Sequence, residues 1–267
     1  MGQSQKKKKI SPVLIIVILI CLAVLGFSAY KLISTMLEYK RGTDEYNGLR
    51  GYTEEQAEDS SLKAEGTESD AAVLRCPISV DFDALKAINE DIVGWLYIKT
   101  LDISYPIVQG EDNSFYLHQT FEKKYNFAGS IFMDMDNRSD FEDPNTIIYG
   151  HNMKNDSMFG RLDEYFKVDA DTDDPHFWIL VPGAEYCYDM FSMDRVDPSG
   201  EVYTLFSGAD ETFVEYARKR AAASVVELPP QEFTTNSKIV TLSTCTGDSV
   251  ARYVVQGVRT VILRHGK

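Results

Sequence analysis

The stretch KIVTLSTCT at residues 238–246 decides how the C-terminal half of this chain folds. Its β-branched and leucine side chains are typical of a buried strand, because such side chains pack well on a pleated surface. Cys245 stands at the end of this strand, and the next residues, TGDS, form a turn signal. A second strand is predicted over residues 252–262, beginning with Arg252. A thiol therefore ends one strand and an arginine begins the next.

This spacing makes Cys245 a candidate nucleophile. A nearby guanidinium favours the thiolate over the thiol, or holds an oxyanion formed when the thiolate attacks a carbonyl. The alternative is that Cys245 is a small buried side chain, which is the commoner role of a cysteine.

The other cysteines do not form a recognisable framework. Cys21 lies in an apolar run, and Cys76 and Cys187 are far apart in sequence, with no C-x-x-C spacing. The pattern argues against a structural zinc site or a set of disulfides. A bridge between Cys76 and Cys187 stays open, and Cys245 is interpreted as free. No metal site and no cofactor are predicted.

Charge is distributed unevenly along the 267 residues. Residues 1–41 hold seven of the 27 basic side chains and one of the 41 acidic ones, so the remainder has 20 basic and 40 acidic groups, a formal net charge of −20. Such a surface repels nucleic acid and disfavours it as a partner. It tolerates or attracts a cationic amine.

The N-terminal region predicts a membrane anchor. Residues 1–12 form a basic tail, and residues 13–33 form an apolar run of the length that crosses a bilayer, about 20 residues. Positive charge before the run predicts a cytoplasmic N-terminus and an exported remainder, a single-pass protein of the cell membrane. A cleaved signal peptide is the alternative, but residues 28–30 (SAY) make a poor cleavage site.

An acidic stalk is predicted over residues 34–72 and a folded domain over residues 73–267. Residues 53–70 hold a single large apolar side chain, Leu62, too little to form a core. In the domain, Asp81 is a candidate cap for a helix at residues 82–89, residues 212–223 form an amphipathic helix, and residues 158–166 have helical spacing. Further strands are expected at residues 94–98, 103–109, 130–134, 146–151, 177–181 and 186–196.

These elements indicate a mainly β domain with added α-helices. Many short strands without regular βαβ alternation favour an antiparallel or mixed closed barrel. His151 follows the strand at residues 146–150, so its position at a strand end matches that of Cys245. A Cys/His pair permits thiolate attack on an acyl group, with the imidazolium protonating the leaving amine. His118, His176 and His265 are assigned to structural or solvent-exposed positions.

Several motifs together resemble the sortase family of cysteine transpeptidases, most closely class B. They are TLSTC at residues 241–245, Arg252, and YGHNM at residues 149–153. The sequences GW, YPIVQ, SIFMD and SMFG, at residues 94–95, 105–109, 130–134 and 157–160, extend the match over about residues 78–263. The resemblance implies a sortase-type closed β-barrel with N-terminal helices and short peripheral helices.

The resemblance also implies an activity. Cys245 would be the nucleophile that cleaves a C-terminal sorting signal of secreted proteins, His151 the general acid and base, and Arg252 the group that positions substrate and stabilises the oxyanion. The thioester would pass to an amine on peptidoglycan or its lipid-linked precursor. Ser243 and Thr244 are candidate groove residues, and Asn152 is a candidate partner for His151. The alternatives are a sorting-signal hydrolase with little transfer and a non-catalytic binding module on the same barrel.

Overall fold

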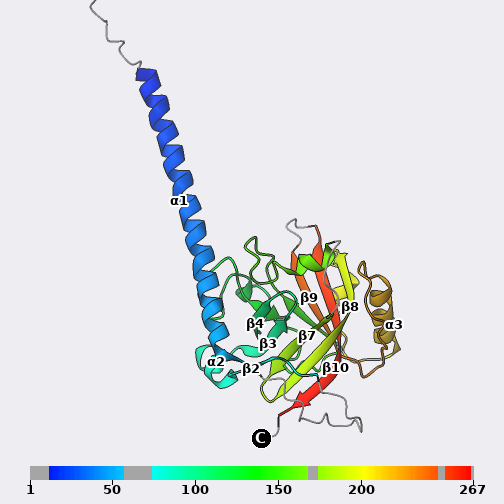
Figure 1. The fold of residues 1–267 in the computed structure, drawn as a ribbon. Helices are drawn as coiled ribbons and strands as arrows, with labels where there is room; N and C mark the ends of the chain where they lie inside the picture. The colour runs from blue at the N-terminus through cyan, green and yellow to red at the C-terminus, as the bar shows by residue number, and fades with distance from the viewer. Residues whose placement is uncertain (1–11, 57–73, 168–173, 246–249, 266–267) are drawn as a thin grey trace, which may run out of the picture. The chain divides into compact units, whose positions relative to one another are not determined.

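The computed structural model describes residues 12–56, 74–167, 174–245 and 250–265, and of Cys245 it describes the backbone (Figure 1). The chain divides into two compact units, Met1–Arg41 and Gly42–Lys267. The candidate catalytic residues all lie in the second unit.

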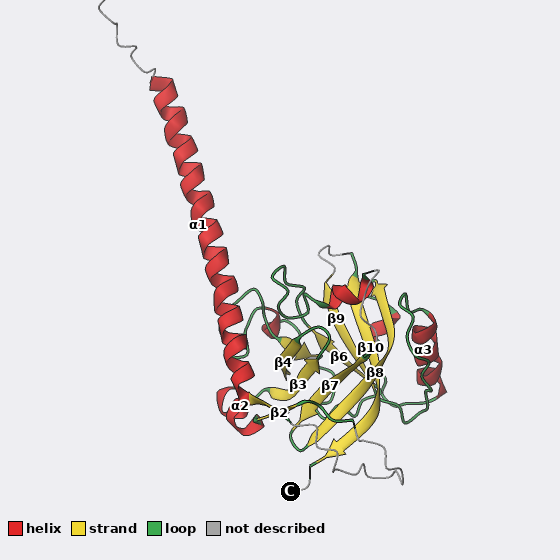
Figure 2. Ribbon diagram, in the orientation of Figure 1, coloured by secondary structure: helices red, strands yellow, loops and turns green. Residues whose placement is uncertain are grey.

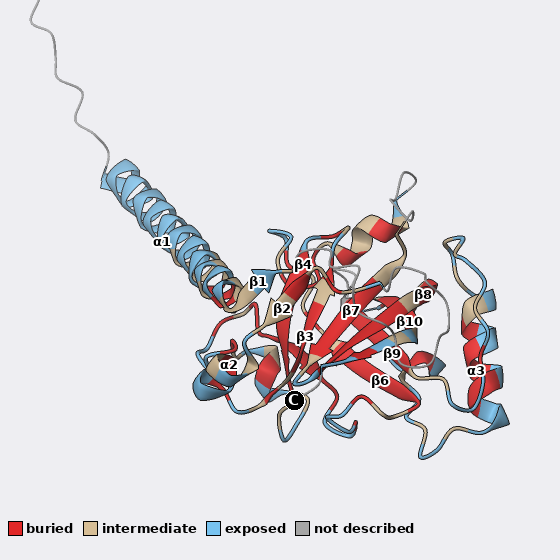
Figure 3. Cartoon of the chain, turned by 60° about the horizontal axis from the view of Figure 1, so that its bottom comes forward, coloured by how far each residue is buried: buried red, intermediate tan, exposed pale blue. Residues whose placement is uncertain are grey.

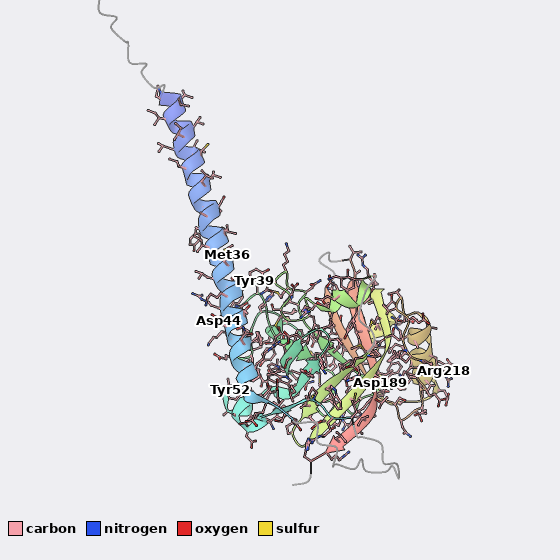
Figure 4. All side chains as sticks on the ribbon, viewed as in Figure 1. Met36, Tyr39, Asp44, Tyr52, Asp189 and Arg218 are labelled. Atoms are coloured by element: carbon pink, nitrogen blue, oxygen red, sulfur yellow. The ribbon has the colours of Figure 1, made fainter. Side chains whose placement is uncertain are left out.

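The unit boundary falls inside one long helix, α1 (Pro12–Leu49), which is followed by the short 3₁₀ helix η1 (Arg50–Tyr52). Figure 4 labels Met36 and Tyr39 before the boundary and Asp44 and Tyr52 after it. By length and composition this helical stretch is apolar enough to cross a membrane. The predicted apolar segment is therefore helical.

The second unit contains a closed barrel of eight strands, as the strand pattern predicts (Figure 2). The strands pair in the order β10-β8-β7-β3-β4-β5-β6-β9, and β9 pairs with β10 to close the barrel. Their bounds are β3 Ile92–Ile98, β4 Ile103–Val108, β5 Ile131–Met133, β6 Asn145–Tyr149, β7 His176–Val181, β8 Ala184–Val196, β9 Ile239–Cys245 and β10 Arg252–Arg264. The β4–β5 and β6–β9 pairs are parallel and the others antiparallel, so the barrel is mixed.

Two α-helices lie outside the barrel where the sequence predicts them. α2 (Phe82–Ile88) begins after Asp81, whose carboxylate accepts a hydrogen bond from the Ala84 amide at 2.9 Å. α3 (Glu211–Ala222) turns its buried face, with Phe213 and Ala217, toward the barrel and its exposed face outward (Figure 3). Three further 3₁₀ helices are η2 (Phe115–Leu117), η3 (Leu162–Phe166) and η4 (Glu201–Tyr203).

Residues 158–166 do not form the single helix that their spacing predicts. The second half is η3, whereas Met158 has a positive φ of 55°, which a regular right-handed helix does not tolerate. Gly160 lies so close to neighbouring backbone that an added Cβ would be 2.4 Å from the Met153 carbonyl oxygen. Tight turns therefore replace the first helical turn.

The compact unit begins earlier than the predicted boundary at residue 73. Residues 42–56 belong to it, because Tyr46 and Leu49 of α1 are buried and β1 (Thr53–Glu55) pairs with β2 (Ile78–Val80). The sequence does not indicate this, since residues 38–56 are mostly polar or charged and contain few large apolar side chains. The most acidic part of the predicted stalk, residues 57–70, lies outside the described residues.

Cys76 and Cys187 are buried free thiols in the structure, without a bridge between them. Burial raises the pKa of the Cys76 thiol to about 12, and burial likewise raises the pKa of Cys187. Both side chains therefore remain protonated at neutral pH. Within the described residues, no group of three His, Cys, Asp or Glu side chains is arranged to hold a metal ion.

Candidate active site

Strand register brings the candidate catalytic residues to one end of the barrel. β6 and β9 are parallel, with Tyr149 paired to Ser243, and the Gly150 amide donates to the Ser243 carbonyl oxygen at 3.2 Å. His151 comes two residues after Tyr149, and Cys245 comes two residues after Ser243. The histidine and the cysteine backbones therefore leave adjacent strands at the same level.

Arg252 begins β10, which pairs with β9 along the edge opposite to β6. The antiparallel register of β9 and β10 pairs Arg252 directly with Cys245. The Arg252 guanidinium donates to the neighbouring Ala251 carbonyl oxygen at 3.1 Å and is half-buried. Cys245 thus has the histidine strand on one side and the arginine strand on the other.

A cavity of about 330 Å³ opens at this end of the barrel. Its volume falls at the lower end of the range of ligand-binding clefts. His151 and Arg252 both line it, as do Ser243 and Thr244 at the end of β9. The other lining residues are Asn113, Leu117, Phe132, Tyr149, Gly150, Pro198 and Tyr203.

Aromatic rings form one wall of this cavity. The Tyr149 ring lies 5.3 Å from the Phe132 ring and 6.4 Å from the Tyr203 ring, centroid to centroid. The Tyr203 hydroxyl lies 2.8 Å from the Ser243 hydroxyl, so either donates to the other. This bond ties η4 to β9 and completes a wall with flat apolar faces and polar edges.

Asp134 holds two of the lining side chains in place. Its Oδ2 atom accepts hydrogen bonds from the Tyr149 hydroxyl and from the Asn113 side-chain amide, both at 2.9 Å. Burial, reinforced by the Asp134 carboxylate, raises the pKa of Tyr149, so the phenol stays protonated and donates. Asp134, which does not itself line the cavity, therefore fixes Tyr149 and Asn113 in position.

His151 is oriented by a backbone carbonyl. Its Nε2 atom lies 2.8 Å from the carbonyl oxygen of Leu117, at the end of η2. Burial lowers the pKa of His151, the Leu117 carbonyl raises it, and the nearby His118 lowers it further, with a net lowering. A half-buried imidazole that is mainly neutral at pH 7 suits a group that both gives and takes a proton.

Comparison with known proteins identifies the family of this site. A sortase domain model matches residues 96–260, more than half of the chain. The chain belongs to the sortase family. It is 37% identical to sortase B of Listeria monocytogenes over 184 residues, covering 65% of this chain and 71% of the relative. It is 27% identical to sortase B of Staphylococcus aureus, covering 87% of this chain and 89% of the relative.

Solved structures of class B sortases have the same fold. Sortase B of Clostridium perfringens matches with a TM-score of 0.63 at 32% identity, covering 67% of this chain and 100% of that one. Sortase B of Bacillus anthracis, in complex with AAEK1, matches with a TM-score of 0.68 at 27% identity, covering 85% and 99% of the two chains. The protein is accordingly a class B sortase-like cysteine transpeptidase.

The predicted groove residues of this sortase have different surroundings. Ser243 and Thr244 both line the cavity, and the Thr244 hydroxyl is buried without a hydrogen-bond partner among the described residues. Asn152 does not line the cavity; its backbone forms an isolated β-bridge with Met158. The contact that orients the His151 ring comes from Leu117.

The cavity residues that come from distant segments carry no recognisable signal in the sequence. Tyr203 and Pro198 lie more than 40 residues before Cys245 in the sequence, in irregular chain with no motif. The motif YGHNM contains Tyr149 but does not mark it as a cavity residue. For Tyr149 a signal existed, because residues at i and i+2 of a strand lie on one face and His151 is two residues later.

Proposed function

We propose that this sortase is anchored in the cell membrane by α1, with a cytoplasmic N-terminus and an extracellular catalytic unit. The most apolar window of the helical stretch has a mean hydropathy of 2.9, and four lysines precede it. A basic cluster before an apolar span favours this orientation. The catalytic unit would then meet secreted proteins as they emerge from the membrane.

The proposed substrates are secreted proteins that carry a C-terminal sorting signal, and the proposed acceptor is an amine of peptidoglycan or its lipid-linked precursor. The Cys245 thiolate attacks the scissile carbonyl, a C–S bond forms, and the C–N bond breaks. His151 gives a proton to the departing amine. Arg252 stabilises the negative charge on the carbonyl oxygen during attack. The acceptor amine then displaces the thiolate.

One observation carries this assignment of roles: the strand register at residues 243–252. It pairs Cys245 with Arg252 and sets His151 level with Cys245 on the parallel neighbour. The cavity lined by His151 and Arg252 supplies the space for a peptide segment beside them. The S. aureus sortase B–substrate complex, 28% identical with a TM-score of 0.62, has the same fold as this chain.

The test uses the full-length protein in detergent micelles with a panel of internally quenched peptides that carry candidate sorting signals. Each peptide is incubated with and without a primary amine, and products are identified by mass spectrometry. Cleavage that yields an amine-ligated product, and that is lost in Cys245→Ala, is expected. Arg252→Ala should lower kcat/KM about 100-fold, the scale of losing one oxyanion-stabilising group. Arg264→Ala, an exposed arginine at the other end of β10, is the matched control.

The same assay separates the two alternatives. Cleavage that gives only the free acid at every amine concentration would mean a sorting-signal hydrolase. No cleavage across the panel, with a Cys245 thiol inert to alkylating reagents, would mean a binding module on this barrel.

A further inference from the structure

Three rings form a row that leads away from the cavity. The His151 and His118 rings are nearly parallel, at 24°, with centroids 6.3 Å apart. The His118 ring in turn faces Tyr125, with centroids 6.2 Å apart and planes at 34°. His151 lines the cavity, whereas His118 and Tyr125 do not. His151 therefore has the cavity on one side and two further rings on another.

The two outer rings are exposed. Tyr125 exposes 73% of its surface, and His118 is exposed as well. Neither ring makes a hydrogen bond to another side chain or backbone group in the described part of the chain. A single exposed aromatic residue is ordinary on a protein surface. What sets Tyr125 apart is that its ring faces His118, whose ring stacks against the catalytic candidate His151.

The segment that carries these rings is a tight hairpin. The Asn126 amide donates to the His118 carbonyl oxygen at 3.0 Å, and the Thr120 amide donates to the Lys124 carbonyl oxygen at 2.9 Å. Lys123 has a left-handed φ of 58° at the turn. This closed turn fixes the position of Tyr125 relative to His118.

Contacts with two other segments, the end of α1 and Asp91, hold the hairpin in place. The Glu122 amide donates to the Glu45 carboxylate at 3.0 Å, and Lys123 forms an ion pair with Asp91 at 2.9 Å. At its base the Tyr46 hydroxyl donates to the Gly129 carbonyl oxygen at 2.6 Å. The exposed rings are thus preorganised, which lowers the entropic cost of binding a ligand.

We infer that His118 and Tyr125 form the docking platform for the incoming amine acceptor, in its cationic primary-ammonium form. This inference rests on the proposed function, because a transpeptidase needs a second substrate to reach the thioester while the first still fills the cavity. His151 lines the cavity, and its ring also packs against the His118 ring of the platform. An acceptor on the platform would therefore be next to the base that must take its proton.

The chemistry of the platform matches a primary ammonium group. Aromatic faces attract ammonium ions through their quadrupole. The net charge of −20 on residues 42–267 favours the approach of a cation. After docking, the ammonium loses one proton to solvent and the neutral amine attacks the thioester carbonyl. A C–N bond forms, the C–S bond breaks, the second amine proton passes to His151, and Cys245 leaves as the thiolate.

The test compares transfer with hydrolysis in the full-length protein, using a sorting peptide that it cleaves and two acceptors. Triglycine supplies a cationic primary amine, and hydroxylamine supplies a small nucleophile that is largely neutral at pH 7. Tyr125→Ala should raise the KM for triglycine about fivefold, the factor expected from one exposed cation–π contact. The KM for hydroxylamine should stay within twofold, as should kcat/KM for the peptide, which reports acylation. His118→Ala should act in the same direction.

Two controls make the result specific. Tyr125→Phe keeps the ring and should leave the KM for triglycine within twofold of wild type. Lys124→Ala changes the neighbouring exposed residue of the hairpin and should do the same. An unchanged KM for triglycine in Tyr125→Ala, or an equal rise in KM for both nucleophiles, would overturn the docking-platform proposal and leave the proposed function standing. An enzyme that cleaves peptide but never transfers to any amine, or that cleaves none, would overturn the proposed function and the platform together.

Discussion

The Nε2 atom of His151 lies 2.8 Å from the carbonyl oxygen of Leu117. A carbonyl oxygen only accepts hydrogen bonds, so Nε2 carries a proton in both charge states of the ring. The nitrogen that gains and loses a proton is therefore Nδ1. This backbone contact fixes the tautomer of the proposed general acid and base.

The first prediction concerns the pH dependence of stability. Burial holds the pKa of folded His151 below its ordinary value of 6.5, so the unfolded chain takes up this proton first as the pH falls. Above pH 6.5 the His151 side chain does not change the free energy of unfolding. As the pH drops from 6.5 through the pKa of the folded state, His151 lowers this free energy progressively. Urea unfolding of wild type and His151→Gln at a series of pH values measures this difference.

The expected result is that wild type loses more stability than His151→Gln between pH 7 and pH 5. An imidazole titration followed by NMR should show a midpoint for His151 below 6.5. Identical pH dependence in the two proteins, or a midpoint above 6.5, would contradict the prediction.

The second prediction concerns Asn145, which is buried on β6 behind the cavity wall. Its side-chain amide donates to the carbonyl oxygens of Val202 and Thr204, at 3.1 and 3.0 Å, on either side of Tyr203. Its oxygen accepts from the Thr241 hydroxyl at 2.7 Å. Asn145→Ala removes three buried hydrogen bonds and should cost about 3 kcal/mol of unfolding free energy, although the Val202 carbonyl keeps its bond from Tyr216 and the Thr241 hydroxyl its bond from Gln256.

Asn145→Ala should also weaken binding of the sorting peptide, because the residues on either side of Tyr203 lose the two bonds that hold their carbonyl groups. We expect KM for the peptide to rise more than kcat falls. Asn155→Ala is the control: Asn155 is exposed, donates to Thr43 at 3.3 Å and accepts from the Ser157 hydroxyl at 2.8 Å, and its loss should change stability by less than about 0.5 kcal/mol. Equal losses of unfolding free energy in the two variants would mean that Asn145 does not hold the backbone around Tyr203.

Local sequence patterns were sufficient to predict most of the barrel. β9 and β10 follow from runs of β-branched residues, and α2 follows from the Asp81 cap and apolar spacing. Register was not predictable, because it depends on which strands pair across long separations in sequence. The parallel β6–β9 pair, which sets His151 level with Cys245, joins residues more than 90 positions apart.

The remaining differences arise where tertiary contacts override local pattern. Tyr46 lies in a charged stretch that lacks enough apolar residues to fold alone, yet it is 4% exposed because the barrel unit covers it. Tyr203 enters the cavity because Asn145 holds its flanking carbonyls, and no feature of residues 198–204 indicates this.

The third prediction concerns Gly150, between Tyr149 and His151. A Cβ atom at this position would lie 2.5 Å from the Ile131 side chain and 2.7 Å from the Phe159 ring. Gly150→Ala should therefore push β6 outward, cost about 2 kcal/mol of unfolding free energy, and lower kcat/KM for the peptide. Gly48→Ala, in α1 with no atom within 4 Å of the added methyl, should instead stabilise by up to about 1 kcal/mol. Unimpaired activity in Gly150→Ala would mean that the site tolerates this shift.

The last prediction concerns Tyr46, which joins the end of α1 to the barrel unit. Its hydroxyl donates to the Gly129 carbonyl oxygen at 2.6 Å and lies 3.1 Å from the Ser130 hydroxyl, while Ser130 donates to the Gln119 carbonyl oxygen at 2.8 Å. Tyr46→Phe keeps the buried ring and removes these bonds, which should cost about 1–2 kcal/mol of unfolding free energy. Tyr125→Phe removes an exposed hydroxyl and should cost nothing measurable.

The Tyr46 bonds also lie at the base of the hairpin that carries His118 and Tyr125. Limited proteolysis should therefore cut residues 119–129 faster in Tyr46→Phe than in wild type, and the ratio of transfer to hydrolysis should fall. A variant that loses stability without either effect would mean that Tyr46 secures the helix end but does not position the hairpin. A variant with both effects would connect the end of α1 to the acceptor half of the proposed reaction through one hydroxyl group.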